Sequence, residues 1–504
     1  MSSNESHTVG IVGAGLVGCL AALAFANEGF KVELFESRPD LRDPDQQVLS
    51  QLRSINLAVS ARGITALRSV DEEMADRVLK DLVPMHGRMV HDLNGKQICQ
   101  KYGLYGECIN SINRSLLNRS LLDELDKLDN VKVTFNHKLI RLDNLKRSSS
   151  DNLENAANSE VVRGHFVGTK TNESLTVENV NVWIGADGSY SQVRSQIQRA
   201  LQMNFSQEYI DHYYLELRIP AKNETAKSSH FDSTCPEAVE VGTEAKFALN
   251  PNHLHIWPRH EYMLIALANS DGSFTCTLFA PKSLFDKELA ISASDADVVS
   301  FFRTNFPSAI ELMGDDLLLE SFRKNPRGSL VCVKCSPYNV GGKAIIIGDA
   351  AHSMVPFYGQ GMNCGFEDVR TLMAILKKHE FDFETGFNEY TETRRKDLGA
   401  IVDLSMRNYQ EMRHDVTSTA YLLRKSVDGF LSRVMGDFWL PLYTMVSFRA
   451  DIPYSRAVQE RQWQNDILTW VIRASVGTSL LAGTALWHGR LFNTLSSLYS
   501  RLTR

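Results

Sequence analysis

Short apolar runs alternate with an Ala- and Leu-rich segment at the start of the chain. Residues 8–13 (TVGIVG) are apolar up to a glycine, residues 16–28 fit a helix, and residues 31–36 (KVELFE) alternate as a second strand does. A strand–turn–helix–strand unit of about 30 residues predicts a domain of the α/β class.

The pattern changes in the second half of the chain. Three strand-like runs, separated by the turn-prone segments PRHE and SDG, predict an antiparallel meander over residues 254–281. The α/β pattern returns at residues 344–352 (AIIIGDAAH), and the chain after about residue 386 is predicted to be helical. The pattern further predicts helices at 121–128 and 366–378, a strand at 131–137 and an exposed polar loop at 147–160.

Charge is distributed unevenly along the chain. Its 54 lysines and arginines and 60 acidic residues give a net charge of −6, which removes the general electrostatic argument for nucleic-acid binding. No acidic residue follows Asp466, so residues 467–504 carry +4 and the preceding part carries −10. The sequence therefore predicts an acidic, globular body and a basic tail that suits anionic lipid.

The cysteines argue for a reducing environment. Eight are too few for a disulfide scaffold in 504 residues, and Cys19, Cys276 and Cys364 stand singly in apolar stretches, as buried thiols do. Cys332 and Cys335 form a CxxC pair with no second pair, which predicts a strand rather than a metal or redox site. The first seven residues lack the basic and apolar stretches of a signal peptide. We expect a cytosol-facing protein without a bound metal.

Three glycines form a GxGxxG motif between the first predicted strand and the first predicted helix. Gly13 permits the tight turn, Gly15 lets a pyrophosphate approach the backbone, and Gly18 lets helix and strand pack closely. Glu36 ends the next strand, where a carboxylate accepts hydrogen bonds from a ribose and repels a 2′-phosphate. The motif predicts binding of FAD or NAD rather than NADP.

Two later segments favour FAD. IGADGSYSQVR (184–194) and IGDAAHS (347–353) each end a predicted strand in a pair of Asp and Gly. Either alone would predict only a turn that caps a strand. FAD is longer than one strand–helix crossover can hold, and Asp349 at a strand end can present its carboxylate to ribityl hydroxyls. The backbone amides of residues 359–363 can face the flavin. The three segments in this order therefore predict FAD.

These motifs resemble those of the single-component FAD-dependent aromatic hydroxylases. Within this family the match narrows to the members that hydroxylate L-kynurenine, and it keeps its order and spacing over residues 8–465, interrupted by the polar segment 147–160. The further matching segments are RSINLAVSARG (53–63), PMHGRMVHDLNG (84–95), INRSLLNRSLL (112–122), LHIWPR (254–259), SFTCTLFAP (273–281), VPFYGQGMNCGFEDV (355–369), DLSMRNYQEMR (403–413) and PLYTMV (441–446).

Pattern and resemblance together predict an α/β fold with a Rossmann-like FAD-binding domain, an antiparallel β-sheet substrate domain and a C-terminal helical region. The expected parts are a discontinuous FAD-binding domain at 8–190 and 322–385, of which 77–105 face the substrate site, a substrate domain at 191–321, a helical region at 386–465 that completes the substrate pocket, and a membrane-associating tail at 466–504.

The resemblance also implies which residues bind each ligand. Besides the motif glycines Gly13, Gly15 and Gly18, it implies FAD contacts at Val17, Glu36, Arg38, Ala58, Arg114, Leu139, Gln192, Asp349, Met362 and Asn363. It implies substrate contacts at Arg88, Tyr102, Asn408 and Tyr443. Some relatives carry a smaller residue in place of Gln192, and we expect only local effects because a backbone contact serves equally well.

The implied substrate residues suit an aromatic amino acid. The guanidinium of Arg88 can hold the carboxylate of L-kynurenine with two hydrogen bonds. Tyr102 and Tyr443 can donate hydroxyl groups, and Asn408 can hydrogen-bond the carboxylate or the amino ketone. This chemistry agrees with the implied contacts.

The implied reaction is the hydroxylation of L-kynurenine to 3-hydroxy-L-kynurenine, in tryptophan catabolism and de novo NAD synthesis. NADPH reduces FAD, the reduced flavin takes up dioxygen as a hydroperoxide, and its distal oxygen attacks the ring carbon ortho to the aniline nitrogen. Phe357, Tyr358 and Gln360 are expected to shield the flavin from water, so no residue is assigned as catalytic acid or base. His352, at a helix start, is predicted to be structural. No second GxGxxG motif is present, so NADPH is expected to bind transiently in a groove on the FAD and substrate domains.

The apolar segment 467–487 contains Arg473 as its only charge, with Trp470 near one end and Trp487 at the other. Its longest uncharged stretch is shorter than a spanning helix requires, which by itself favours a buried or an interfacial helix. The two flanking tryptophans favour membrane association, with spanning and lying on the membrane both left open. Eukaryotic members of the family are attached to the mitochondrial outer membrane by a C-terminal segment. The resemblance implies the same location here, with the catalytic body facing the cytosol.

Two alternatives stay open on sequence alone. One is a related FAD-dependent hydroxylase for another aromatic acid. The other is a non-catalytic flavoprotein docked at a membrane, which would keep the regions around Gly15 and Asp349 but would not need Arg88 and the three residues grouped with it.

Overall fold

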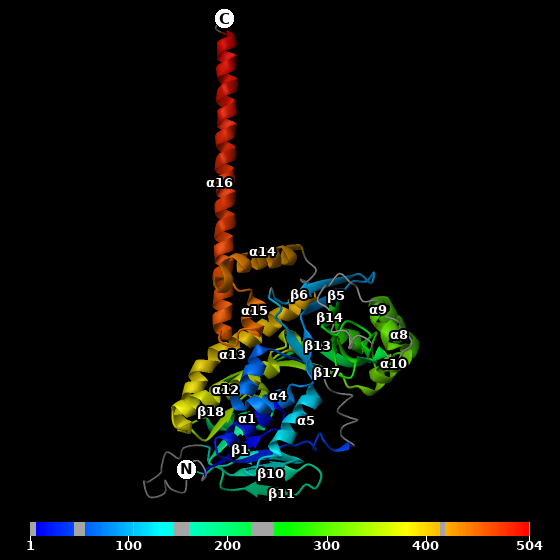
Figure 1. Cartoon of the computed structure of the whole chain (residues 1–504), viewed down its shortest axis with the longest axis vertical. Coiled ribbons are helices and arrows are strands. Elements are labelled where there is room, and N and C mark those ends of the chain that lie inside the picture. Colours follow the sequence, from blue (N-terminus) through cyan, green and yellow to red (C-terminus); the bar gives the residue numbers. More distant parts are fainter. Residues whose placement is uncertain are drawn as a thin grey trace.

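The computed structural model describes residues 7–44, 56–103, 105–145, 161–222, 246–413 and 419–502. They form two large sheets and two small ones, with long helices at the C-terminal end (Figure 1). The predicted loop at 147–160 lies outside the described residues.

The first large sheet has six strands in the order β18-β19-β12-β1-β2-β8, and all neighbours are parallel except the edge strand β18. Its strands are β1 (Thr8–Val12), β2 (Lys31–Phe35), β8 (Val131–Thr134), β12 (Val182–Gly185), β18 (Asn339–Val340) and β19 (Ala344–Ile346). Parallel strands buried on both faces consist of near-continuous apolar runs, as the N-terminal sequence shows. The predicted α/β class is confirmed.

Helix α1 (Leu16–Asn27) is buried along nearly its whole length, because α5 (Arg114–Leu125) and α12 (Gly361–Lys378) pack against it beside β1 and β2. This explains its uniformly apolar sequence. Helix α5 begins at Arg114, earlier than predicted, because the Asn113 side chain accepts hydrogen bonds from the Ser115 and Leu116 amides and caps it. Helices α3 (Ala61–Val70), α4 (Glu72–Val78) and α6 (Gln192–Ala200) complete this part of the fold.

The second large sheet has seven strands in the order β17-β13-β16-β15-β14-β5-β6. The predicted meander is confirmed, since β14 (His253–Arg259), β15 (Tyr262–Ala268) and β16 (Phe274–Pro281) pair antiparallel in sequence. The remaining strands are β5 (Gly87–His91), β6 (Gln97–Lys101), β13 (Asn204–Ile219) and β17 (Gly328–Ser336). Four helices pack on this sheet around a separate core: α7 (Lys282–Asp286), α8 (Asp295–Asn305), α9 (Pro307–Met313) and α10 (Asp315–Lys324).

The structure corrects one predicted boundary. The segment 322–385 does not return to the first sheet at residue 322, because β17 pairs with β13 over most of its length and stays in the second sheet. The chain rejoins the first sheet at β18. Cys332 and Cys335 both lie in β17 as buried thiols, as the strand interpretation of the CxxC pair predicted.

The predicted strand at 131–137 is also corrected. β8 ends at Thr134, and β9 (His137–Leu142) enters a different, three-stranded sheet with β10 (Gly164–Gly168) and β11 (Ser174–Val177). Asn136 separates the two strands with a φ of +59°, in the left-handed region that asparagine tolerates better than most residues. The other small sheet contains β3 (Asn56–Val59), β4 (Val83–Met85) and β7 (Ile109–Asn113).

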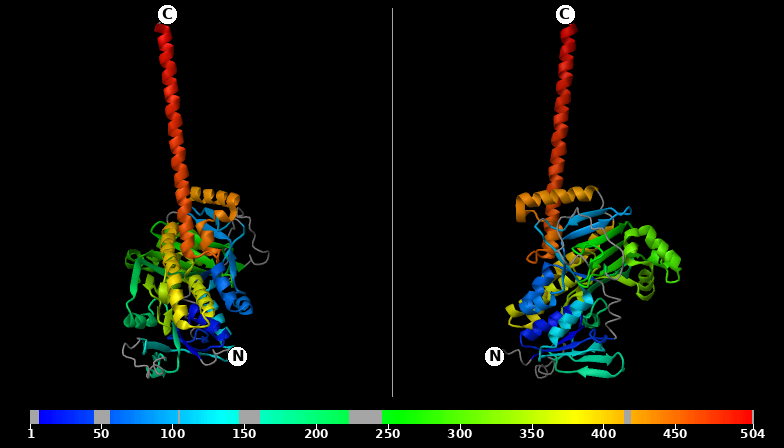
Figure 2. Two further views of the ribbon diagram at one scale, coloured as in Figure 1. Left: turned by 90° about the vertical axis from the view of Figure 1, so that its left-hand side faces the viewer. Right: turned by 45° about the vertical axis from the view of Figure 1, so that its right-hand side comes forward.

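The chain from Phe383 onward is helical in its described parts, as predicted: α13 (Phe383–Arg413), α14 (Thr419–Met435), the short 3₁₀ helix η7 (Gly436–Phe438), α15 (Leu442–Ser447) and α16 (Tyr454–Leu502). Helix α13 contacts β18 of the first sheet and β14 and β17 of the second. Helix α16 starts in the body and projects far beyond it (Figures 1 and 2). Within the described ranges, no helix combines the length and apolar character needed to cross a membrane.

Candidate active site

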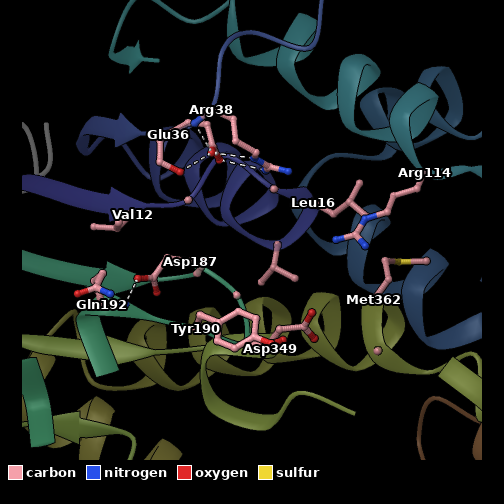
Figure 3. A pocket seen from close by; sticks show the side chains of 18 of the residues that line it. Val12, Leu16, Glu36, Arg38, Arg114, Asp187, Tyr190, Gln192, Asp349 and Met362 are labelled. Atoms are coloured by element: carbon pink, nitrogen blue, oxygen red, sulfur yellow. Dashed lines mark hydrogen bonds and ion pairs between the residues drawn. The ribbon is translucent and has the colours of Figure 1, made fainter. Parts of the chain in front are cut away.

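A cavity of about 590 Å³ opens at the carboxyl ends of β1, β2 and β12, where an open α/β sheet binds its ligand. Figure 3 shows side chains from several of these elements facing it. Eleven of the thirteen residues predicted to contact FAD line it: Gly13, Gly15, Val17, Glu36, Arg38, Ala58, Arg114, Leu139, Gln192, Asp349 and Met362. Gly18 and Asn363 lie behind this lining and hold it in shape.

The three motif glycines have separate tasks. Gly13 has a φ of +103°, and a Cβ there would lie 2.5 Å from the Ala186 carbonyl oxygen. A Cβ on Gly18 would lie 1.8 Å from the Gly13 carbonyl oxygen, so this position fixes the contact between helix and strand. No atom lies within 4 Å of a Cβ built on Gly15, which leaves room for a ligand against the backbone. This is the division of tasks that the motif predicts.

Glu36 and Arg38 form the end of the cavity at β2 (Figure 3). The Glu36 carboxylate accepts hydrogen bonds from the Ala14 amide at 2.9 Å and from Arg38 Nε at 2.9 Å. Burial alone would raise the pKa of Glu36, but Arg38 outweighs burial and the pKa lies below its usual value. A carboxylate held ionised here is an acceptor for ribose hydroxyls.

Two charged groups with few interaction partners among the described residues lie in the opposite part of the cavity. Arg114 extends its guanidinium into the cavity (Figure 3) and forms no ion pair with any residue that the structure describes. Asp349 begins the short helix α11 (Asp349–His352) directly after Gly348, which has a φ of +58°. Arg114 suits a phosphate or a flavin carbonyl, and Asp349 suits ribityl hydroxyls. Together with the open Gly15 position, these groups fit FAD.

The middle Asp-Gly motif has a structural task. The Asp187 carboxylate accepts hydrogen bonds from the backbone amides of Gln192 at 2.6 Å and Val193 at 3.2 Å, in the first turn of α6, whose N-cap is Ser191. Burial raises the pKa of Asp187. The amide of Gln192 is therefore committed to Asp187, whereas its side chain lies in the cavity lining (Figure 3).

A short 3₁₀ helix, η5 (Pro356–Tyr358), separates this cavity from a cluster of aromatic residues. Pro356 and Gly359 line the cavity. Phe357 and Tyr358 instead turn their rings to the other side, where Phe357 stacks on Tyr409 at 4.1 Å between ring centroids. The residues predicted to shield the flavin therefore do not all face its cavity: η5 lies between that cavity and the aromatic cluster.

Gln360 is not part of the wall that η5 forms between the cavity and the aromatic cluster. Its Oε1 accepts a hydrogen bond from the Tyr454 hydroxyl at 3.1 Å, it is buried, and it is not part of the cavity lining. Asn363 holds the wall from behind by donating to the carbonyl oxygens of Ala58 and Gly359, both at 2.7 Å.

The four predicted substrate residues converge beside η5. Tyr102 and Tyr443 stack at 5.0 Å between ring centroids, and Tyr443 stacks in turn on Tyr358 at 5.6 Å. The Arg88 guanidinium lies 5.2 Å from the Tyr443 ring centroid and 5.7 Å from that of Tyr102. Asn408 donates a hydrogen bond to the Phe357 carbonyl oxygen at 2.7 Å and so fastens η5 to α13.

Arg88 is a buried cation that is only partly paired. The nearest carboxylate, of Glu411, lies 3.6 Å from its Nη1, which is beyond hydrogen-bond distance, and its Nε has no hydrogen-bond partner among the described residues. Burial would lower the pKa of Arg88, but the neighbouring tyrosines and Glu411 outweigh burial and raise it. A buried guanidinium with a free edge is a binding site for a carboxylate.

Glu411 was missed by the sequence prediction. It lies on α13 three residues after Asn408, a spacing that puts both on one face of a helix, and this spacing was the available signal. Its Oε1 also accepts a hydrogen bond from the Tyr421 hydroxyl at 2.9 Å.

His352 belongs to a buried ion network behind the cavity. Its Nε2 contacts the Asp368 carboxylate, which also accepts from the Gly348 amide at 3.0 Å and from Arg394 Nε at 3.1 Å. Burial would raise the pKa of Asp368, but His352 and Arg394 outweigh burial and lower it. The structural interpretation of His352 agrees with this geometry, because Asp368 ties it to the turn that carries Asp349.

Cys364 lies close enough to His352 and Asp368 for the three to hold a metal ion. Arg394, however, donates a hydrogen bond to Asp368 and lies 3.8 Å from the Cys364 sulfur. The Arg394 guanidinium already neutralises the Asp368 carboxylate that a metal ion would need, so these residues form an ion network instead.

Asp368→Asn is expected to lower the free energy of unfolding by about 3–5 kcal/mol, because it leaves buried positive charge on Arg394 and His352 uncompensated. Urea denaturation measures this loss. Asp403→Asn, which removes an exposed carboxylate paired with Lys334, is the control and should change stability by less than about 1 kcal/mol. Equal effects of the two substitutions would contradict the role of the network.

Comparison with known proteins adds to this geometry. Residues 311–405 match the family model of an FAD binding domain, and residues 11–42 match that of an NAD(P)-binding Rossmann-like domain. The second match covers the GxGxxG motif, and the first covers η5 and α12.

Related sequences are similar over almost their whole length. Kynurenine 3-monooxygenase of Yarrowia lipolytica is 52% identical, over 96% of this chain and 100% of that protein. The chain belongs to the kynurenine 3-monooxygenase family. The member from Saccharomyces cerevisiae is 49% identical, over 96% of this chain and 98% of that protein, and the one from Anopheles gambiae is 40% identical, over 98% and 93%.

Membership of this family confirms the predicted resemblance, the FAD cofactor and the class of enzyme, an FAD-dependent monooxygenase. Solved structures confirm the fold. 2-Methyl-3-hydroxypyridine-5-carboxylic acid oxygenase aligns with a TM-score of 0.59 at 18% identity, over 83% of this chain and 95% of that one. p-Nitrophenol 4-monooxygenase from Pseudomonas putida aligns with a TM-score of 0.58 at 16% identity, over 84% and 94%.

Proposed function

We propose that this protein hydroxylates L-kynurenine to 3-hydroxy-L-kynurenine with NADPH and dioxygen. The observation that carries the proposal is Arg88, a buried and partly paired guanidinium set among stacked tyrosines on the far side of η5 from the FAD cavity. Such a site suits a ligand with both a carboxylate and an aromatic ring. The sequence similarity to kynurenine 3-monooxygenases supports kynurenine as that ligand.

FAD, when bound, supplies the electron transfer from NADPH and the activation of dioxygen. Glu36 and Arg38 would hold its ribose, Gly15 would leave room for its pyrophosphate, and Arg114 and Asp349 would hold the remainder. These residues line one continuous cavity, which supports their assignment to one extended cofactor.

The substrate residues would bind L-kynurenine and orient its ring. Arg88 would take the substrate carboxylate on its free edge, and the Tyr102 hydroxyl, buried without a hydrogen-bond partner in the described structure, would add a donor. Asn408 would position the wall of the substrate site, because its amide donates a hydrogen bond to the Phe357 carbonyl oxygen and so fixes η5. The amino group of the substrate activates its own ring, so no protein base is required.

The rings of η5 would exclude water from the reacting atoms. Phe357 packs between Tyr409 and Phe279, with ring centroids 4.1 and 4.9 Å away. Phe357→Ala is expected to raise the fraction of NADPH oxidised without hydroxylation several-fold, because water reaches the flavin. Hydrogen peroxide formed per NADPH measures this fraction at equal flavin content. An unchanged ratio would contradict the role of η5.

A panel of aromatic acids tests the substrate assignment. L-Kynurenine should stimulate NADPH oxidation by the purified yellow protein more than anthranilate, 4-hydroxybenzoate or tryptophan does. Stronger stimulation by another acid would favour a related hydroxylase, and no stimulation by any of them would favour a non-catalytic flavoprotein.

We further propose that residues 467–504 attach the protein to the mitochondrial outer membrane with its body facing the cytosol. Their charge of +4 and the exposed Trp470, Ile472 and Trp487 support attachment to anionic lipid. Protease added to intact mitochondria should digest the body, and the protein should co-sediment with outer-membrane markers. Recovery in the soluble fraction would contradict the proposal.

A further inference from the structure

Helix α14 turns an apolar face to the solvent. Leu423, Val427, Phe430 and Val434 follow one another at intervals of four, three and four residues, which places them along one face of a helix. Leu423, Phe430 and Val434 are 66%, 65% and 68% exposed, and Val427 is half-buried. We call these four residues the α14 stripe. A helix on the surface of a soluble domain normally buries such a face.

The polar face of α14 is hydrogen-bonded to the rest of the protein. Asp428 accepts hydrogen bonds from Arg424 Nε at 3.0 Å, Arg461 Nη1 at 2.7 Å and Trp439 Nε1 at 3.1 Å. Tyr421, on the same side of the helix, donates to Glu411 beside the substrate residues. The α14 stripe therefore cannot rotate inward without breaking the contacts of Asp428 with Arg461 and Trp439 and that of Tyr421 with Glu411.

Exposed apolar side chains continue from α14 onto α16. Of the 18 large apolar side chains that are exposed among the described residues, ten lie between residues 423 and 487, so the exposure is concentrated at one end of the molecule. They include Phe438 in η7, at 82% exposure, and Trp463 and Trp470 in α16. Figures 1 and 2 show α14 lying across the end of the body from which α16 projects. Exposed apolar side chains gathered at one end of a molecule in this way mark an interaction site.

The charges beside this surface favour an anionic lipid surface as its occupant. Arg433 is exposed next to the α14 stripe, and the part of α16 beyond Asp466 contains arginines and no acidic residue. Apolar residues on one side with basic residues at the margin are typical of helices that lie in the plane of a membrane interface.

We propose that the α14 stripe lies in the interfacial region of an anionic bilayer, parallel to its surface, as a second membrane contact beside α16. This rests on the membrane attachment proposed above for the tail, and it adds a contact made by the enzyme body itself. The bilayer would then cover the outer side of the helix whose inner side holds Glu411 through Tyr421.

Photo-crosslinking in the full-length holoenzyme tests the proposal. p-Benzoylphenylalanine replaces Phe430 in one protein and Ile291, a 70% exposed side chain far from α14 in the sequence, in a control. Each is mixed with phosphatidylcholine vesicles containing phosphatidylserine, separated by flotation and irradiated. We expect lipid adducts at position 430 and none at position 291.

A combined variant gives a second measurement. Leu423→Ser, Phe430→Ser and Val434→Ser together should lower the vesicle partition coefficient by about tenfold or more, whereas Ile291→Ser should leave it unchanged. Chain-to-chain crosslinks at position 430 would overturn the proposal in favour of a second copy. Floating protein without lipid adducts at position 430 would overturn it while leaving tail attachment intact. A full-length protein that does not float at all would overturn both.

Discussion

Arg88→Met should weaken binding of L-kynurenine by about 2–5 kcal/mol, equivalent to about 30-fold to several thousand-fold in Kd, while FAD stays bound. Arg88 is buried beside Tyr102 and Tyr443, so methionine fills much of its volume but offers no donor to the substrate carboxylate. Quenching of flavin fluorescence on titration with L-kynurenine measures the Kd.

Two further variants sharpen this prediction. Arg88→Lys keeps the charge without the two-pronged geometry and should give an intermediate Kd. Arg68→Met removes an exposed arginine that pairs with Glu72 and Asp76, and it should leave the Kd unchanged. If Arg88→Met binds L-kynurenine as tightly as the natural protein, Arg88 is not part of the site.

Gly15→Leu and Gly18→Val should both weaken flavin binding strongly, for different reasons. At Gly15 the backbone has an ordinary φ of −75° and a side chain meets no atom, so leucine fills the cavity but leaves the fold intact. We expect FAD affinity to fall by on the order of a hundredfold or more. The free energy of unfolding of the apoprotein should change by about 1 kcal/mol or less, the usual effect at a helix N-cap.

At Gly18 the added Cβ would collide with the Gly13 carbonyl oxygen, and the backbone there cannot give way without separating α1 from β1. Gly18→Val should therefore destabilise the apoprotein by about 3 kcal/mol or more. Flavin fluorescence measures the loss of FAD affinity, and urea denaturation of the apoproteins measures the change in the free energy of unfolding. Equal stability of the two variants would show that the two glycines do not have separate tasks.

Local sequence patterns predicted the parts of the fold that depend on neighbouring residues. The strand before Gly13, the buried helix α1 and the meander over 254–281 follow from apolar periodicity and from the turns between strands. The pairing of β14 with β5 does not, because it joins segments more than 160 residues apart and nothing in β5 specifies its partner. The membership of β17 in the second sheet was missed for the same reason.

Motif spacing and family resemblance pointed to residues that the structure brings together around one cavity, because GxGxxG and the Asp349 segment each specify a backbone geometry at the end of a strand. The spacing of Glu411 from Asn408 indicates a shared face of α13, but its approach to Arg88 depends on where α13 packs, which local patterns do not specify. The exposed face of α14 is similar: periodicity predicts a helix with an apolar side, but only the contacts of Asp428 show that this side faces outward.

The most direct test of the proposed function follows the oxygen atom. The purified holoenzyme is given NADPH, L-kynurenine and dioxygen labelled with a heavy isotope, and the product is identified by mass spectrometry. We predict 3-hydroxy-L-kynurenine carrying one labelled oxygen atom, formed in proportion to the NADPH consumed. A protein with its full complement of FAD that oxidises NADPH and yields no labelled hydroxykynurenine would contradict the account.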